Sequence, residues 1–206
     1  MRSATAIPTH SGLDFDVLAP RAEDVRLVDV VHALSHLCRF TGHTRIFWSV
    51  GAHVMLVADL VRDRLDGGPQ AQLAALLHET SEAYLCDLPT PLKYGTNIGQ
   101  TYREVEERLM AVAAEAFGLP PDFHRDPIVK QADELAVVIE AIHLMRNPPW
   151  AIERATSAGA VELVAAYAHR FRRDATPAHT RSVLRERILA TATAAGHDLM
   201  QLAGAA

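Results

Sequence analysis

Residues 49–65 read SVGAHVMLVADLVRDRL, and residues 70–84 read QAQLAALLHETSEAY. Ser49 is a residue suited to cap a helix, and the valines after it recur at helical spacing, at Val50, Val54, Val57 and Val61. The run Asp66-Gly67-Gly68-Pro69 separates the two segments, because Gly and Pro interrupt helices. The second segment is apolar from Leu73 to Leu77 and therefore predicts a central helix over about residues 70–84.

Helical periodicity also dominates most of the remaining chain. It predicts further helices over about 24–42, 99–117 and 125–145, and two Ala- and Arg-rich helical stretches that divide near Thr176 in the last fifty residues. Between about 86 and 97 the prolines and glycine exclude a continuous helix. Before residue 24, Leu13, Phe15 and Val17 alternate with aspartates in the period of a strand.

The predicted fold class is therefore all-α, with a short N-terminal extended segment. A chain of 206 residues is expected to form a single domain. We expect its core to span about 24–147, with a C-terminal helical appendage over about 150–206.

The composition narrows the function classes. Hydrophobic residues make up 49% of the chain and charged residues 22%, which is typical of a globular protein and excludes a disordered one. The formal net charge of −5 argues against binding duplex nucleic acid, which depends on clustered basic residues. No apolar run approaches the roughly 18–20 residues that cross a bilayer, and we expect neither a membrane span nor a secretory signal. The two cysteines, Cys38 and Cys86, are too few for a disulfide framework, so we expect a cytoplasmic protein.

Three places put imidazole or carboxylate groups inside apolar helical runs: His53, the pair His78-Glu79, and Asp133. Burying such groups without partners costs several kcal/mol, so their repetition indicates side chains that meet. A divalent cation would compensate all of them, and histidine nitrogen with carboxylate oxygen is an ordinary ligand set for zinc, manganese, iron or cobalt. Judged on spacing alone, the alternative of ordinary core histidines and solvated carboxylates stays open.

The order of these residues resembles the H…HD…D signature of the HD-domain metal-dependent phosphohydrolases. Residues 78–84, HETSEAY, and 87–93, DLPTPLK, resemble the HDASE…GDLPTPVK block of the 5′-deoxynucleotidase branch. Residues 36–50 resemble small phage and prophage HD hydrolases, which include phage dATP triphosphohydrolases, in HLCRFTGHTR and the later FWSV. The resemblance covers about residues 13–145 and implies an HD-domain helical bundle.

The resemblance implies one divalent ion, whether Zn, Mn, Co, Fe or Mg, with four ligands: His53, His78, Glu79 and Asp133. Glu79 stands where the family has Asp; it keeps the charge but adds a methylene, which can alter metal identity, affinity or activity. Ala52 stands where many relatives have Glu or Gln, so a possible partner of the metal-binding His53 is missing from that position.

Two further acidic residues acquire roles from the resemblance. Glu82 follows His78 by one helical turn and resembles the family's catalytic glutamate, which positions or deprotonates the attacking water. Asp87 is carried over as a general acid or a contact to the sugar, and the alternative is an aspartate that caps a turn. Glu140, two turns after Asp133, is a candidate support behind the ligands, unless it is a surface glutamate.

An acidic protein needs local cations to hold a phosphate. Lys93 and Arg39 are the main candidates, and Arg45 is a weaker third. Arg39 with Phe40 resembles an Arg-Trp pair that shapes the nucleoside pocket of the deoxynucleotidases, with the phenyl ring as the aromatic wall. His43 could line the same pocket.

The resemblance thus implies hydrolysis of a phosphate ester of a nucleotide, most readily a deoxynucleotide. Either a 5′-monophosphate yields nucleoside and phosphate, or a dNTP yields nucleoside and triphosphate. The expected partners are a small nucleotide substrate and, by the same resemblance, further copies of the chain. The alternatives are a catalytically impaired metal- or nucleotide-binding HD protein, in which Glu79 marks the loss of activity, and a domain that zinc merely stabilises.

Overall fold

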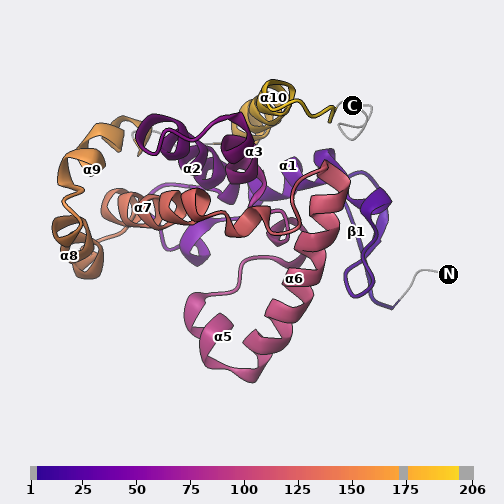
Figure 1. Cartoon of the computed structure of the whole chain (residues 1–206). Helices are drawn as coiled ribbons and strands as arrows, with labels where there is room; N and C mark the ends of the chain where they lie inside the picture. The colour runs from indigo at the N-terminus through magenta and orange to yellow at the C-terminus, as the bar shows by residue number, and fades with distance from the viewer. Residues whose placement is uncertain (1–3, 172–175, 200–206) are drawn as a thin grey trace.

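The computed structural model describes residues 4–171 and 176–199, and it is predominantly all-α (Figure 1). The longer helices are α1 (Leu27–His36), α2 (Val50–Arg64), α3 (Pro69–Leu77), α6 (Asn97–Phe117), α7 (Pro127–Leu144), α8 (Pro149–Ser157) and α10 (Pro177–Ala194). Shorter ones are α4 (Glu82–Leu85), α5 (Thr90–Gly95), α9 (Val161–Tyr167) and the 3₁₀ turns η1 (Ala22–Asp24), η2 (Arg39–Gly42), η3 (Phe123–Arg125) and η4 (Ala168–Phe171). The predicted fold class is confirmed.

The expected extended segment is an antiparallel hairpin of β1 (Ala6–Pro8) and β2 (Asp14–Asp16). Ile7 lies opposite Phe15, and Gly12 takes a φ of 82° in the connecting turn, a conformation that favours glycine. Phe15 is fully buried and stacks on Tyr84 with 3.9 Å between the ring centroids. The turn of the hairpin also bonds to α1, because Ser11 donates to both carboxylate oxygens of Asp29, at 2.6 Å from its backbone nitrogen and at 2.8 Å from its hydroxyl. The hairpin is therefore attached to the helical core through aromatic stacking and through hydrogen bonds.

Several helix ends follow from local chemistry that the sequence predicts. Ser49 caps α2 by accepting a hydrogen bond from the backbone nitrogen of Ala52 at 3.1 Å. Gly118 ends α6 in the left-handed region with a φ of 65°. Asp126, a cap that the sequence analysis did not single out, accepts from the nitrogen of Ile128 at 2.8 Å at the start of α7.

Two predicted helices are wrong in their extent. The first ends at His36 rather than Gly42, because the chain turns there to form an antiparallel bridge between Cys38 and Ser49. The turn of η2 follows, with Phe40 and Thr41 at φ of 51° and 54°. The helix predicted over 70–84 ends at Leu77 and resumes only as α4. Between 86 and 97 no continuous helix forms, as predicted, although α5 occupies part of this segment.

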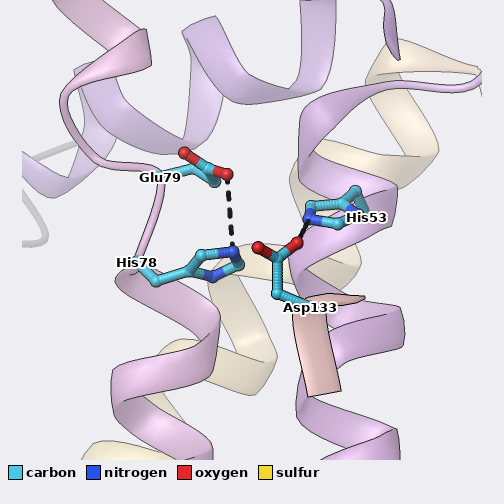
Figure 2. A group of neighbouring side chains, drawn as sticks. All are labelled: His53, His78, Glu79 and Asp133. Carbon is cyan, nitrogen blue, oxygen red and sulfur yellow. Dashed lines mark ion pairs between the residues drawn. The ribbon is translucent and has the colours of Figure 1, made fainter. Parts of the chain in front are cut away.

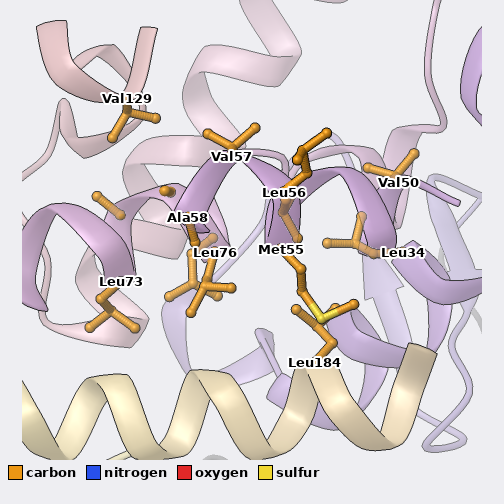
Figure 3. Close-up of a cluster of buried hydrophobic side chains, with 14 of the residues drawn as sticks. Leu34, Val50, Met55, Leu56, Val57, Ala58, Leu73, Leu76, Val129 and Leu184 are labelled. Atoms are coloured by element: carbon orange, nitrogen blue, oxygen red, sulfur yellow. The ribbon is translucent and has the colours of Figure 1, made fainter. Parts of the chain in front are cut away.

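The core is built around α2, which is buried from Val50 to Val61 and exposed only in its last three residues. It packs against α1, α3, α7 and α10, and Figure 1 shows α2 and α3 lying between α7 and α10. Figure 3 shows the apolar side chains of this region, with Leu184 entering from α10. Leu184 and Ile188 are fully buried, so the C-terminal helix completes the same core as the preceding helices.

Ion pairs also attach the C-terminal segment to α2. Asp59 is almost completely buried, and Arg187 donates to its Oδ1 at 2.7 Å. Arg170 of η4 makes a further ion pair with the same carboxylate. A buried carboxylate needs such partners, because an unpaired one is costly to desolvate.

Helices α5 and α6 form a hairpin that projects from the remaining helices (Figure 1). Gly99 makes the close approach possible, because a Cβ there would lie 2.2 Å from the carbonyl oxygen of Leu92. The hairpin forms one wall of the cleft described below.

We expect Leu184→Ala to lower the free energy of unfolding by about 2–5 kcal/mol, since it deletes fully buried methyl groups and leaves a cavity. Urea denaturation measures the change. The matched control is Val161→Ala, whose side chain is 57% exposed and which should change stability by no more than about 0.5 kcal/mol. Equal stabilities of the two variants would contradict a core role for α10.

Candidate metal centre

Four predicted ligands converge although they come from three separate parts of the chain. His53 lies on α2, His78 and Glu79 directly follow α3, and Asp133 lies on α7. One possible ligand atom from each lies within 4.8 Å of all the others (Figure 2). No other group of three or more histidines, cysteines, aspartates or glutamates among residues 4–171 and 176–199 converges in this way. The arrangement can hold a metal ion.

The interruption after Leu77 places two of these ligands. Residues 78–81 form tight turns, in which the nitrogens of Thr80 and Glu82 bond to carbonyls three residues earlier rather than four. The Thr80 hydroxyl donates to the carbonyl of Leu77 at 2.6 Å and so competes with continuation of α3. Glu82 therefore begins α4, and the expectation that it shares one continuous helical face with His78 is wrong.

Hydrogen bonds orient both imidazole rings toward the centre. His53 Nδ1 donates to Glu140 Oε1 at 3.0 Å, and His78 Nδ1 donates to the carbonyl oxygen of Ala75 at 2.6 Å. Because both partners only accept, the proton of a neutral ring lies on Nδ1 and the lone pair on Nε2. Both Nε2 atoms are buried and lack a hydrogen-bond partner among the described residues, as metal-ligating nitrogens would.

The two carboxylates complete the set. Asp133 Oδ1 lies 3.2 Å from His53 Nε2, but without the alignment of a hydrogen bond, and Glu79 Oε1 lies 3.5 Å from His78 Nε2. The added methylene of Glu79 thus still allows its carboxylate to reach the group. The chemistry of the donor set and its two unpartnered nitrogens fit a metal ion.

The electrostatics of the cluster favour a positive charge at its centre. Burial and Arg39 lower the pKa of His53, but the carboxylates of Glu140 and Asp133 outweigh them and raise it to about 9. Burial opposes ionisation of Asp133, yet His53 and His78 hold the pKa of this carboxyl well below its usual range. Burial lowers the pKa of His78. A cation bound here would replace a proton as the positive charge.

Glu82 lies beside this cluster, but its pKa is shifted in the opposite direction from that of Asp133. It is 4% exposed, and its Oε2 has no hydrogen-bond partner among the described residues. Burial raises the pKa of its carboxyl well above the usual value, and the negative charges of Glu79 and Asp87 add to this effect. A buried carboxyl with a raised pKa and an oxygen without a hydrogen-bond partner among the described residues is suited to exchange a proton with a bound water.

A cleft of about 1510 Å³ opens onto the cluster, and His78, Glu79 and Asp133 line it. Five other predicted site residues line it as well: Arg39, Phe40, Glu82, Asp87 and Lys93. His43 is also part of the lining, as expected. These residues come from η2, α4, α5 and the turn before α5. The structure therefore brings them together in one cleft.

Arg45 is not among the lining residues. It is exposed, and its guanidinium donates to the carbonyl of His143 at the end of α7. The structure does not bring Arg45 together with the other predicted phosphate contacts.

Sequence reasoning missed two residues of α6, Glu106 and Tyr102, that bond to the segment between residues 86 and 93. Lys93 Nζ pairs with Glu106 Oε1 of α6 at 2.7 Å, and the hydroxyl of Tyr102 donates to the carbonyl of Cys86. Trp48, which the sequence places in the core, is buried but also donates through its ring nitrogen to Glu140. Glu140, which the sequence marks as a candidate support behind the ligands, is fully buried rather than a surface glutamate.

The chain has relatives among known proteins. It is 35% identical over 134 residues, 65% of this chain and 69% of the relative, to the uncharacterized protein YfdR of Escherichia coli (strain K12). The chain belongs to the YfdR family. A second member is the uncharacterized protein RCAP_rcc00048 of Rhodobacter capsulatus, 36% identical over 137 residues, 64% of this chain and 68% of the relative. No model of a known protein family matches the chain.

Two further observations bear on the cellular setting of this YfdR-family chain. None of the helices in residues 4–171 and 176–199 combines the length and the apolar character that a membrane crossing requires. Cys38 and Cys86 are both exposed and unpaired.

We expect His78→Ala to abolish binding of about one equivalent of Mn²⁺, because the ring supplies a ligand nitrogen that no neighbouring side chain can replace. Calorimetric titration of protein freed of metal by chelation measures the binding. His36→Ala is the control, since this exposed histidine lies outside the cluster and should leave the affinity unchanged. A tightly bound ion in His78→Ala would contradict the proposed ligand set.

Proposed function

We propose that the chain is an HD-domain metal-dependent phosphohydrolase that acts on a nucleotide, most readily a deoxynucleotide. The observation that carries the proposal is the convergence of His53, His78, Glu79 and Asp133 beside the buried, unpartnered Glu82. A divalent ion held there supplies Lewis-acid polarisation of a phosphoryl oxygen and activation of water. The order of these residues along the chain, and the DLPTPLK segment, support the assignment to this family.

Glu82 is the proposed general base. A water molecule that attacks phosphorus must release a proton, and Oε2 of Glu82 is available to accept it. Asp87 faces the same cleft and is the proposed acid or sugar contact. Arg39 and Lys93 supply the positive charge for the phosphate. Both also lie near enough to Glu82 to lower its pKa, whereas Glu79 and Asp87 raise it.

The aromatic ring of Phe40 supports the proposal of a nucleoside as the organic part of the substrate. Phe40 lines the cleft next to Arg39, whose guanidinium carbon lies 5.4 Å from the ring centroid. A flat ring beside a cation can contact a base or sugar while the cation contacts the phosphate. Both reactions stay in the proposal: release of phosphate from a 5′-monophosphate, and release of triphosphate from a dNTP.

A screen of nucleoside mono-, di- and triphosphates with added Mn²⁺, Co²⁺, Zn²⁺ or Mg²⁺, reading both phosphate and triphosphate, tests the proposal. Bound metal without turnover on any nucleotide would favour the alternative, a metal- or nucleotide-binding protein in which Glu79 marks lost activity. Unfolding on chelation would favour a structural metal instead.

We expect Glu82→Gln to lower turnover at least about 100-fold while Mn²⁺ binding is retained, because the amide cannot accept the proton and the four ligands are untouched. Steady-state kinetics on the best substrate of the screen, together with calorimetry, measures both properties. Glu104→Gln is the matched control, since Glu104 is an exposed glutamate in the same cleft. Wild-type turnover in Glu82→Gln would exclude the proposed base.

We expect Arg39→Ala to raise KM about 10–100-fold, as the loss of a charged hydrogen bond to phosphate would. Metal content should persist, because Glu140 keeps its bonds to Trp48 and His53. The control is Arg45→Ala, which removes an arginine outside the cleft lining and should leave KM unchanged. An unchanged KM in Arg39→Ala would rule out its role in phosphate binding.

A further inference from the structure

Glu140 is a fully buried carboxylate on α7 that accepts four N–H bonds. Its Oε1 accepts from Trp48 Nε1 at 2.8 Å and from His53 Nδ1 at 3.0 Å. Its Oε2 accepts from Arg39 Nε at 3.3 Å and from Arg39 Nη2 at 3.2 Å. Because every partner is a donor, the group has to be an acceptor at both oxygens, which requires the ionised carboxylate.

The partners of Glu140 belong to two different parts of the site, the candidate metal ligands and the lining of the cleft. His53 is a candidate metal ligand on α2, and Arg39 lies at the start of η2 and lines the cleft. Trp48 lies at the end of the same loop, just before α2, and its carbonyl oxygen accepts a hydrogen bond from the backbone nitrogen of Arg39 at 2.8 Å. One carboxylate thus joins the metal-binding helix to the loop that carries the cleft arginine.

The loop needs such an attachment. Phe40 and Thr41, directly after Arg39, both have a backbone in the left-handed region. This conformation costs a non-glycine residue free energy, and it persists only where the surrounding structure holds it. The bond from Arg39 to Glu140 and the backbone bond from Arg39 to Trp48 hold the first residue of this turn. The guanidinium makes no hydrogen bond through Nη1 to a described residue, so this nitrogen remains free to donate to a ligand.

We propose that Glu140 is a positioning residue that holds His53 as a ligand through Nε2 and, with its second oxygen, holds Arg39 at the cleft. It contacts neither the metal position nor the reacting atoms and acts through these two side chains. Such carboxylate–histidine–metal arrangements typically change metal affinity about 10–100-fold when the carboxylate is lost. The part that concerns Arg39 rests on the proposed function, whereas the part that concerns His53 does not.

Glu140→Gln distinguishes this role from a merely structural one. The amide has one oxygen and one NH₂ group, and repulsion from the guanidinium favours the oxygen facing Arg39. The NH₂ group then faces His53 and can only donate, so the ring must move its proton to Nε2, where it blocks metal binding. The expected result is a 10–100-fold increase in the Kd of Mn²⁺.

Calorimetric titration with Mn²⁺ provides the test, with circular dichroism to show that each variant is folded. The control is Glu134→Gln, because Glu134 adjoins the ligand Asp133 in sequence but is exposed and pairs only with Arg154 among the described residues. A Kd within twofold of wild type in folded Glu140→Gln, or an equal loss in Glu134→Gln, would overturn the proposal.

A second measurement needs no variant and covers the case in which Glu140→Gln fails to fold. In the Zn²⁺-loaded wild-type chain, histidine ¹⁵N spectra should show His53 protonated at Nδ1, coordinated through Nε2 and slow to exchange that proton. Coordination through Nδ1 would overturn the proposal. If Glu140→Gln loses Mn²⁺ affinity as predicted but the metal-loaded wild-type chain hydrolyses no nucleotide, the proposed function is refuted and the role of Glu140 toward His53 is supported.

Discussion

The packing of α2 between α3 and α7 is the constraint on which the rest of the structure depends. This packing buries His53 completely, together with the apolar residues on the same helix. A buried imidazole nitrogen without a partner is costly, because water cannot reach it. Glu140 serves Nδ1 of His53, whereas Nε2 has no hydrogen-bond partner among the described residues and faces Asp133 and the turn after α3. The candidate metal centre is thus a consequence of where the core places one polar side chain.

The carboxyl groups around His53 differ in whether they have a cationic or donor partner. Glu140 and Asp133, with Arg39 and His53, form a buried group in which each carboxylate has a cationic or donor partner, and their pKa values are held low. Glu82 lacks such a partner for one oxygen, and its pKa is raised. Two types of carboxyl therefore lie within one cleft, one type suited to stay ionised and the other suited to exchange a proton.

The differences from the HD pattern are accommodated by neighbouring residues. Ala52 carries no carboxyl group, and it packs against Trp48 and Leu144. The partner of His53 comes instead from Glu140, 87 positions along the chain. Glu79 stands where the HD pattern has an aspartate, and the tight turns after Leu77 still bring its longer side chain into the group.

The sequence by itself determined the all-α class and the caps at Ser49 and Gly118, because periodicity and capping are local signals. Polar residues in apolar runs singled out the four residues of the cluster, and the resemblance to the HD hydrolases named them together as ligands. It could not determine the end of α3 at Leu77, since residues 78–84 contain no Gly or Pro to mark an end, and only contacts of the turn decide it. Nor could it place Arg45 outside the cleft or α10 in the core. Those positions depend on which helix faces meet, and that is decided by tertiary packing between residues that lie far apart in the sequence, 98 positions in the case of Arg45 and His143.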